Sequence, residues 1–485
     1  MRKNGRARLV FAVGLVSLAA SLAGAVQLSA HKPFWGDEAQ EILQTCEQES
    51  AHMATDGAIG QCSPLPIYYI LQRTQARIGS IAGEGIAIWT RRISLLAAVG
   101  LVAVMVWMLY PQGGLPAFLG AASVIDNPLF FQFAAEARPY MLWLWAYALA
   151  MGLFWRDYHD RRPKSLMRRG AISLFLAGLV SPGSGQAFAF WAAEGVPRSK
   201  RTALWIGLIL VASFAVSFYY AGSTCMRTGA SEGTWSTSPH RDLILGFLRV
   251  ALPSGPFAWT MTGVLCVGLY SLFRDPSASG RAIRNILVTQ GLATAALVGL
   301  ILYFDYFLVQ RNFVFMMIWR GILVGLGTSY ILSRFRTVAL ECVATALLLA
   351  LPVASWFRVH RHRSFVADFP VPLDTRYRED KAPDLYYYTF EKHRPGFSPT
   401  FEGALNFAAR VEKSIVSDTD VSDTDRSAAT PRPRCFIDTY HPTDPCPTDP
   451  PPIRATPRTT SNATETASEP IRLAICGRDF QLNRR

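Results

Sequence analysis

Residues 9–30 read LVFAVGLVSLAASLAGAVQLSA and contain no charged side chain. A helix needs about 20 consecutive apolar residues to cross a bilayer, so this stretch is long enough to span one. The basic residues before it, Arg2, Lys3, Arg6 and Arg8, are typical of a cytoplasmic flank. The alternative is a cleaved signal peptide, because residues 28–30 (Leu-Ser-Ala) resemble a cleavage site. However, the stretch is longer than a signal core and more apolar segments follow, so we expect an uncleaved anchor.

The composition indicates a membrane protein, and the front of the chain is its most apolar part. Half of the residues are hydrophobic, 17% are charged and the formal net charge is +13. The basic residues flank many apolar segments and are not gathered in one polar domain, which favours the positive-inside rule over nucleic-acid binding. None of the eight cysteines forms a Cys-x-x-Cys pair, so zinc and redox motifs are not supported.

Apolar segments and basic turns together predict about 11 membrane spans. After residues 9–30, the expected segments are 93–110, 115–135, 139–155, 171–180, 187–193, 203–221, 257–273, 286–304, 313–332 and 338–356. With this count every basic turn between spans falls on the cytoplasmic side. The segments 171–180 and 187–193 are each too short to span alone. They are interpreted either as two short helices that meet at a wet cavity or as one poorly delimited pair.

The tail is expected to be a separate extracytoplasmic unit. We divide the chain into a transmembrane domain, residues 1–357, and a small α+β or irregular tail, residues 358–485. Strand patterns occur at residues 385–390 and 472–476. Between them, residues 417–470 are rich in Ser, Thr, Asp and Pro, a composition typical of disorder.

Four cysteines carry expectations of their own. Cys46 and Cys62 fall in one external loop, and sequence alone leaves open whether they form a disulfide. Cys266 and Cys342 lie in apolar runs, where we expect them to pack as small hydrophobic side chains.

Two adjacent carboxylates, Asp37 and Glu38, follow the first span within an external loop of residues 31–88. Other acids in the loop make a plain solvated face one interpretation; these are Glu41, Glu47, Glu49 and Asp56. Residues 64–73 are apolar and aromatic but too short to span. They suit a helix in the membrane interface, with Tyr68 and Tyr69 at headgroup depth. Such a helix would hold the carboxylates beside the membrane surface.

A second polar group falls on the same predicted side, where Glu136 and Arg138 separate two expected spans. One interpretation is an ordinary surface pair, which would contribute little to stability. The other is a phosphate anchor, because guanidinium binds phosphate oxygens in a bidentate manner. Pro139 suits the first turn of the helix that follows.

Charges also occur inside apolar runs, where they are costly and usually face a cavity or a partner. They are Asp126, Arg320 and Glu341. Asp126 precedes Asn127-Pro128, so we expect a helix break there. Arg311, beside Asn312, is either a second phosphate ligand or an interfacial arginine that reaches for water.

These motifs, in this order, resemble the polytopic GT-C glycosyltransferases, in particular the bacterial branch related to protein mannosyltransferases and aminoarabinose transferases. The matching stretches are Asp37-Glu38-Ala39, residues 64–69 (PLPIYY), residues 92–96 (RISLL) against an Arg-x-x-Ser-Leu pattern, and residues 136–140 (EARPY). The resemblance is strong over about residues 30–150 and nearly absent in the tail. Ser63 stands where the pattern has His, and Arg311-Asn312-Phe313 replaces an Arg-Tyr pair.

The resemblance implies a GT-C fold and an inverting transfer from a polyprenyl-phosphate sugar to an acceptor hydroxyl on the outer face of a bacterial cytoplasmic membrane. It implies Asp37 as the general base, and Glu38 as an aid to the acceptor or to a divalent cation, should one bind. Arg138 is the first and Arg311 the second expected ligand of the phosphate. Glu136 would orient Arg138, and the tyrosines at 68, 69 and 140 would line the substrate groove. The sugar, the acceptor (glycan, lipid or protein) and the metal remain open.

Two other classes fit parts of the sequence. A transporter or flippase would explain the broken segment at residues 181–185 and the charges within apolar runs, although no repeated segment pair is visible. A non-catalytic scaffold that displays the tail would leave the arrangement of residues 37–69 unexplained.

Overall fold

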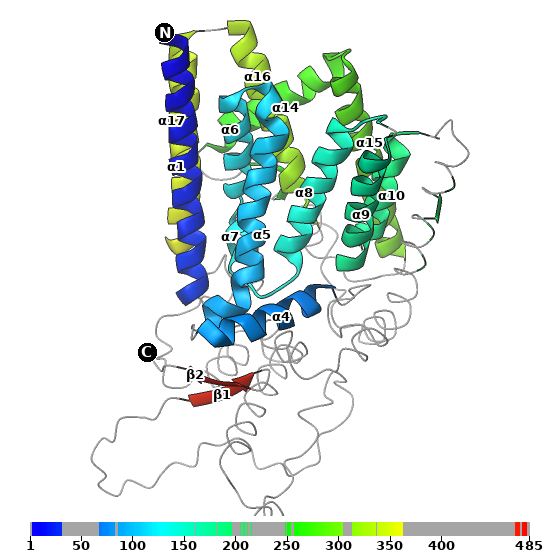
Figure 1. The fold of residues 1–485 in the computed structure, drawn as a ribbon. Coiled ribbons are helices and arrows are strands. Elements are labelled where there is room, and N and C mark those ends of the chain that lie inside the picture. The colour runs from blue at the N-terminus through cyan, green and yellow to red at the C-terminus, as the bar shows by residue number, and fades with distance from the viewer. Residues whose placement is uncertain are drawn as a thin grey trace, which may run out of the picture.

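The computed structural model describes residues 2–31, 67–82, 86–160, 162–180, 182–195, 257–303, 313–335, 337–361, 471–475 and 478–482, with positions 204, 207, 208, 211, 215, 248 and 250–253. This part of the chain is mainly helical, as the sequence predicted. Long helices stand side by side in a bundle, and one shorter helix, α4, lies across an end of it (Figure 1).

The described elements have the following bounds, given in chain order. They are α1 (Arg2–His31), α4 (Ile67–Ala82), α5 (Ile86–Leu109), η1 (Tyr110–Gln112), α6 (Gly114–Ile125), α7 (Pro128–Ala134), α8 (Tyr140–Arg156), α9 (Pro163–Leu179), α10 (Pro182–Ala193), α14 (Ala258–Arg274), α15 (Ala278–Tyr303), α16 (Met316–Phe335), α17 (Val338–Arg361), β1 (Ile471–Ile475) and β2 (Arg478–Leu482).

Within the described residues, five helices are long and apolar enough to cross a membrane, and a bent pair makes a sixth candidate. The five spans are Leu9–Ser29, Arg91–Gln112, Ala278–Gly299, Met316–Phe335 and Val338–Phe357. Each overlaps a segment expected from the sequence. The sixth is α6 with α7, bent by 73°. The protein is therefore a multi-pass membrane protein, and the count of about 11 spans stays a prediction.

Helices α8, α9 and α14 have 17 residues each and α10 has 12. Helix α9 begins at Pro163, eight residues before the expected start at 171, because a proline is well placed in a first helical turn. It packs closely on α10: a Cβ at Gly183 would lie 2.0 Å from the carbonyl oxygen of Leu176. The region thus forms two consecutive helices that pack against each other, and a wet cavity where they meet stays a prediction. The expected span 203–221 lies almost entirely outside the described residues.

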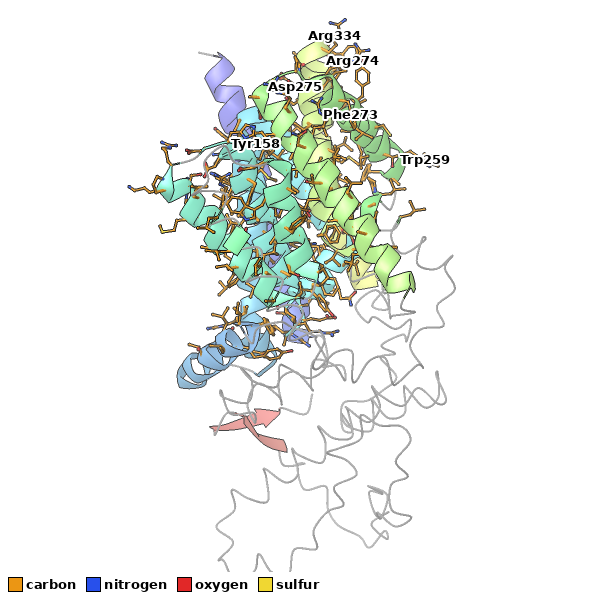
Figure 2. The ribbon with its side chains drawn as sticks, turned by 90° about the vertical axis from the view of Figure 1, so that its right-hand side faces the viewer. Tyr158, Trp259, Phe273, Arg274, Asp275 and Arg334 are labelled. Atoms are coloured by element: carbon orange, nitrogen blue, oxygen red, sulfur yellow. The ribbon has the colours of Figure 1, made fainter. Side chains whose placement is uncertain are left out.

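The described basic connections lie together at one end of the bundle, where Arg274, Arg334 and Tyr158 are seen in Figure 2. Hydrogen bonds join the helix ends there: Trp155 Nε1 donates to Ser279 Oγ (2.9 Å). In the loop between α8 and α9, hydrogen bonds from Arg162 lower the pKa of Asp160 to about 2. That carboxylate is therefore ionised at neutral pH. Helix α4 lies at the opposite end (Figure 1).

Glycines allow α16 to approach two neighbours closely. A Cβ at Gly327 would lie 2.1 Å from the carbonyl oxygen of Val264, and a Cβ at Gly268 would lie 1.9 Å from that of Leu323. On the other side of α16, a Cβ at Gly321 would lie 2.9 Å from the Gly120 oxygen of α6. Small residues at such contacts are the usual means of packing helices in a membrane.

We expect Gly268→Ala to lower the thermal unfolding midpoint of the detergent-solubilised protein, because the new methyl group would force α14 away from α16. Overpacking of this kind costs about 1–3 kcal/mol. Gly263 of the same helix has no heavy atom within 4 Å of a Cβ placed on it. Gly263→Ala is the matched control and should leave the midpoint unchanged or raise it, since alanine favours helix formation. Equal midpoints for the two variants would contradict this packing.

The expected strand at 472–476 is found as β1, which pairs antiparallel with β2 from Ile471↔Leu482 to Ile475↔Arg478. A two-stranded hairpin is marginally stable alone, so it does not by itself establish a folded α+β unit. The other expected strand, residues 385–390, and the expected disordered segment, residues 417–470, lie outside the described residues.

One expectation about cysteines was wrong. Cys266 on α14 and Cys342 on α17 are exposed on the surface of the bundle and are not packed inside it. A helix in a membrane is apolar on its outer face as well, so an apolar run does not reveal which side chains face inward. Cys46 and Cys62 lie outside the described residues.

Candidate functional site

The break between α6 and α7 is built from polar side chains inside the bundle. Asn127 caps α7 with its Oδ1, which accepts from the backbone N–H of Leu129 (3.0 Å), and Pro128 starts the helix. Ser355 of α17 donates to the carbonyl oxygen of Asp126 (3.0 Å). Backbone groups must be satisfied at membrane depth, and these contacts satisfy part of the interrupted backbone. The break expected at Asp126 is confirmed.

Arg320 supports the same break from α16. Its guanidinium donates to the carbonyl oxygen of Ser123, in the last turn of α6, and to that of Leu252 (3.2 Å). A cation at the carboxyl end of a helix also interacts favourably with the helix dipole. Arg320 is buried, as expected for a charge in an apolar run. Glu341 is different: it is exposed in the first turn of α17 and does not lie inside the bundle.

Helix α7 leads directly into the turn of residues 135–139, which carries the second predicted polar group. Ser94 of α5 donates to the carbonyl oxygen of Glu136 (2.5 Å) and approaches that of Arg138 (3.3 Å). One hydroxyl thus fixes the backbone on both sides of Ala137. The Arg138 guanidinium carbon lies 4.8 Å from the centroid of the Tyr140 ring, a cation–π distance.

The side chains of this turn are enclosed by the fold. Glu136 is 0% and Arg138 is 1% exposed. The interpretation as an ordinary surface pair is therefore wrong. The sequence could not reveal this burial, because it gives no sign of how neighbouring helices cover the turn. Burying charges in a membrane bundle is expensive, and such residues usually pair with other groups or serve a function.

Helix α4 confirms the expected non-spanning helix after the first span. It has 16 residues, continues to Ala82 beyond the expected segment, and lies across the end of the bundle where α1 ends (Figure 1). Tyr68 and Tyr69 are buried, and their rings meet edge to face with centroids 5.6 Å apart. Gln72 is also buried one turn further along. The inward side of α4 is thus aromatic with polar tips.

Arg91 is a residue that the sequence analysis did not single out. It is fully buried, and its Nη1 donates to the carbonyl oxygen of Ser29 (2.6 Å) in the last turns of α1. Arg91 and Ser94 have the three-residue spacing of Arg-x-x-Ser, so the motif begins at Arg91 and not at Arg92. The spacing in the sequence could have identified it. Arg91 holds the end of α1, and Ser94 holds the turn with Arg138.

The structure brings five of the predicted site residues to one end of the bundle. They are Tyr68 and Tyr69 of α4, Glu136 and Arg138 of the turn, and Tyr140 of α8. The start of α16 lies beside the start of α8, since the rings of Phe315 and Trp143 are 5.9 Å apart. Arg311 itself, with Asp37 and Glu38, lies outside the described residues. Within the described ranges no group of three His, Cys, Asp or Glu residues could hold a metal ion.

A buried polar network links α8, α10 and α15. Trp143 Nε1 donates to Gln186 Oε1 (2.9 Å), and Gln290 Nε2 donates to the backbone oxygen of Gln186 (2.8 Å). At the other end of the α9–α10 pair, Arg169 and Glu194 form a buried ion pair. These contacts join residues far apart in the sequence, so no local pattern could have identified them.

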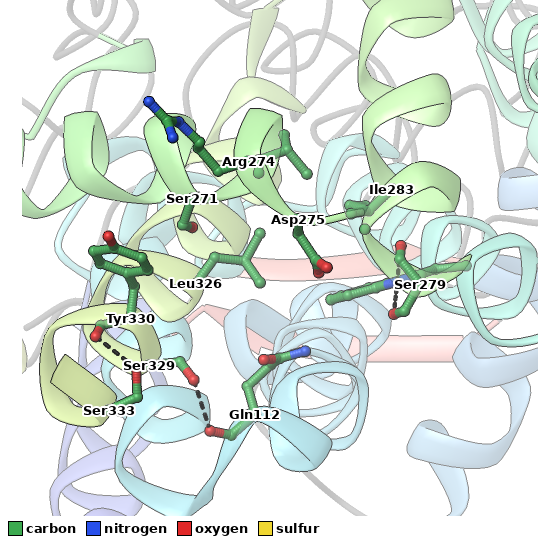
Figure 3. A pocket seen from close by; sticks show the side chains of 13 residues that line it. Gln112, Ser271, Arg274, Asp275, Ser279, Ile283, Leu326, Ser329, Tyr330 and Ser333 are labelled. Carbon is green, nitrogen blue, oxygen red and sulfur yellow. Dashed lines mark hydrogen bonds between the residues drawn. The ribbon is translucent and has the colours of Figure 1, made fainter. Parts of the chain in front are cut away.

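A separate cavity of about 260 Å³ lies beside Arg274 and Asp275, at the opposite end of the bundle (Figure 2), and is drawn close up in Figure 3. Its walls include Gln112, Ser271, Arg274, Asp275 and Tyr330. Ser329 closes one side by donating to the backbone oxygen of Gln112 (3.1 Å). The cavity lies with the basic connections, away from α4, and does not belong to the candidate site.

No protein-family model matches this chain, and no curated protein sequence matches it.

We expect Ser94→Ala to destabilise the fold and loosen the α7–α8 turn. Removing the hydroxyl leaves buried carbonyl groups without this donor, a loss of about 1–3 kcal/mol. The thermal unfolding midpoint measures the effect. Ser333→Ala is the control, because the Ser333 hydroxyl bonds a carbonyl of its own helix on an exposed face. A midpoint for Ser94→Ala equal to that of Ser333→Ala would contradict the role of Ser94.

Proposed function

We propose that this chain is a membrane glycosyltransferase. It moves a sugar from a polyprenyl-phosphate donor to an acceptor hydroxyl at the outer face of the bacterial cytoplasmic membrane, in the synthesis of a cell-envelope glycan. The observation that carries the proposal is the buried Arg138 in a turn that Ser94 fixes, at the end of the bundle where α1 ends and α4 crosses. The orientation, with the N-terminus in the cytoplasm and the tail outside, belongs to the proposal.

The leaving group of this reaction is a phosphate, which develops negative charge as the glycosidic bond breaks. A fixed guanidinium in a water-poor site stabilises that charge more strongly than it would in water. Arg138 is the proposed clamp, with Arg311 as a second ligand. Glu136, two residues away, orients Arg138, and a carboxylate beside a guanidinium is a suitable partner for that task.

The acceptor hydroxyl must lose its proton as it attacks the sugar. Asp37 is the proposed general base and Glu38 assists the acceptor or a cation. Asp37 follows the last residue of α1 by six positions, and six extended residues reach at most about 20 Å. Since Arg91 fixes the end of α1 to α5, this reach supports a base close to the same end of the bundle as Arg138.

Tyr68 and Tyr69 are proposed to line the groove for the lipid or the acceptor, with Tyr140 against Arg138. Aromatic rings with a polar tip suit the boundary between headgroups and hydrocarbon.

The alternative function is a transporter or flippase for a lipid-linked or anionic substrate. The observation that favours it is the break between α6 and α7, since interrupted helices often form binding sites in transporters. Against it, Asn127, Ser355 and Arg320 are hydrogen-bonded to backbone at this break, an arrangement that suits a fixed support.

One experiment separates the two functions. The purified protein is reconstituted in vesicles with a radiolabelled polyprenyl-phosphate sugar and a detergent extract of envelope acceptors. A glycosyltransferase moves label to a new product, whereas a flippase changes the leaflet of the labelled lipid and leaves its chemistry intact. Intact labelled lipid with altered sidedness would therefore refute the proposed transfer.

A further inference from the structure

The cavity at the end of the bundle with the basic connections combines a carboxylate with several hydroxyl groups. Its volume is about 260 Å³, and η1, α14, α15 and α16 contribute to its walls. Pockets for drug-sized ligands have about 300–1,000 Å³, so this cavity suits a smaller group. The proposed sugar transfer uses none of its residues.

The fold holds the carboxylate of Asp275 in place between α14 and α15. Its Oδ1 accepts from the backbone N–H of Ser277 (2.9 Å). Gly280 leaves room for the other oxygen, since a Cβ there would lie 2.5 Å from Oδ2. Figure 3 shows the carboxylate directed into the cavity, whereas the guanidinium of Arg274 is directed away from it. A carboxylate has about four acceptor positions, so the bond from Ser277 leaves most of them to a ligand.

Serine oxygens in the same wall also face the cavity as acceptors. The hydroxyl groups of Ser271, Ser329 and Ser333 each donate to a backbone carbonyl oxygen, at 2.8, 3.1 and 2.8 Å. A hydroxyl has one proton and two acceptor lone pairs, so these groups offer a ligand their lone pairs. With the Asp275 carboxylate they favour a positively charged group that is rich in donors. A primary ammonium, with three N–H donors and no acceptor, is such a group.

Three other polar groups of the wall are compatible with the same ligand. Trp155 Nε1 donates to Ser279 Oγ (2.9 Å), so the proton of that hydroxyl can face an anionic oxygen. The amide of Gln112 and the hydroxyl of Tyr330 can each donate or accept. The wall can therefore satisfy an ammonium together with an anionic oxygen.

Arginines surround the cavity on its polar side. Arg274 lines it, and its guanidinium carbon lies 5.3 Å from the centroid of the Tyr270 ring. Arg281 donates through Nη1 to the backbone of the connection that carries Asp275 (2.6 Å), and Arg284 donates to the last turn of α14 (3.4 Å). Guanidinium groups bind phosphate oxygens strongly. A ligand with a phosphate next to its ammonium would therefore use both the carboxylate and these arginines.

The cavity lies at the depth of lipid headgroups. One candidate span ends at Gln112, another begins at Ala278 and a third ends at Phe335. Asp275 and Ser333 lie next to these limits. The ends of membrane spans meet the headgroup region, and basic pockets between membrane helices bind lipid headgroups. This depth favours a headgroup over a molecule dissolved in water.

We propose that this cavity binds the headgroup of phosphatidylethanolamine. The primary ammonium meets Asp275 and the serine oxygens, and the phosphate, two carbons away, meets the arginines. Phosphatidylcholine has a quaternary ammonium without N–H donors, and phosphatidylglycerol has no cation, so neither gives the carboxylate its partner. The inference goes beyond the proposed sugar transfer and does not depend on it.

Direct binding tests the cavity without any sugar transfer. The purified full-length protein in detergent is titrated with phosphatidylethanolamine, and bound lipid is counted by native mass spectrometry. Asp275→Asn removes the charge that faces the ammonium but keeps an oxygen for Ser277, since asparagine caps helices as well as aspartate does. We expect it to weaken binding roughly tenfold or more. Gly280→Ala keeps the charge, displaces the carboxylate and should also weaken binding.

Matched controls use another carboxylate and other headgroups. Asp160→Asn removes a carboxylate at the same end of the bundle that does not line this cavity, so it should bind phosphatidylethanolamine as the unaltered protein does. Phosphatidylcholine and phosphatidylglycerol should bind the unaltered protein at least tenfold more weakly. They should also be insensitive to Asp275→Asn, because they lack the ammonium donors.

The inference is overturned if Asp275→Asn binds phosphatidylethanolamine normally, if Asp160→Asn loses binding to the same extent, or if the three lipids bind equally well. Free phosphoethanolamine distinguishes the source of the headgroup. We expect it to compete only in large excess, because it lacks the acyl chains that hold the lipid at this depth. Tighter binding of free phosphoethanolamine than of the lipid would overturn the lipid as the ligand.

Discussion

Asp37→Asn should slow sugar transfer by about 100- to 10,000-fold, which is the usual contribution of a general base. Asparagine has nearly the same shape as aspartate but cannot accept the proton of the attacking hydroxyl. The measurement is transfer of radiolabel from a polyprenyl-phosphate sugar at saturating donor. Donor binding, measured separately, should be nearly unchanged, because the base acts on the acceptor.

Neighbouring acids of the same loop supply the control for Asp37. Glu47→Gln and Asp56→Asn remove the same charge without removing the proposed base, so they should retain normal rates. If all three variants lose activity equally, the loop acts through its total charge and the base is elsewhere. Normal turnover by Asp37→Asn would falsify the proposed mechanism.

Arg138→Ala should have the second largest effect, a loss of about 100- to 1,000-fold in the rate of transfer. The loss follows from removing the positive charge that stabilises the departing phosphate. It should appear as weak use of the lipid-phosphate donor, with the acceptor dependence unchanged. Transfer rates measured over a range of donor concentrations, and then over a range of acceptor concentrations, check both the weak use of the donor and the unchanged dependence on the acceptor.

Arg138 is fully buried, so its removal also leaves the buried Glu136 in a changed electrostatic environment. Arg138→Lys retains the charge but presents a single ammonium instead of a fork, and we expect partial activity. Ser94→Ala supplies the structural comparison, because it loosens the same turn and leaves the guanidinium in place. If Ser94→Ala and Arg138→Ala lose activity in proportion to their loss of thermal stability, Arg138 has a structural role and is not the clamp.

Local properties of the sequence predicted much of the fold. The apolar length of residues 9–30 identified α1, and the Asn127-Pro128 pair located the break between α6 and α7. The tyrosines at 68 and 69 marked a helix that does not span. Each of these three features depends on a few consecutive residues. The partition of such a short segment between water and lipid is largely independent of the rest of the chain.

The environment of the candidate site could not be predicted in this way. A surface pair was one of two interpretations of Glu136 and Arg138, and both residues are buried. The motif was aligned on Arg92, whereas Arg91 makes the contact with α1. Cys266 was expected inside the bundle and is exposed. In each case the outcome depends on which face of a helix meets a neighbour, and both faces of a membrane helix are apolar.

The sequence by itself determined that this is a multi-pass helical membrane protein, where the helix break at Asn127-Pro128 falls, and which residues are candidates for chemistry. Apolar length and flanking charge decide insertion into a bilayer, and both are local quantities. The tertiary structure decided which candidates meet. Gly268 and Gly327 let α14 and α16 approach, Arg320 supports the break between α6 and α7, and Ser94 fixes the turn with Arg138. These contacts join backbone groups far apart in the sequence, and they form only when the helices pack.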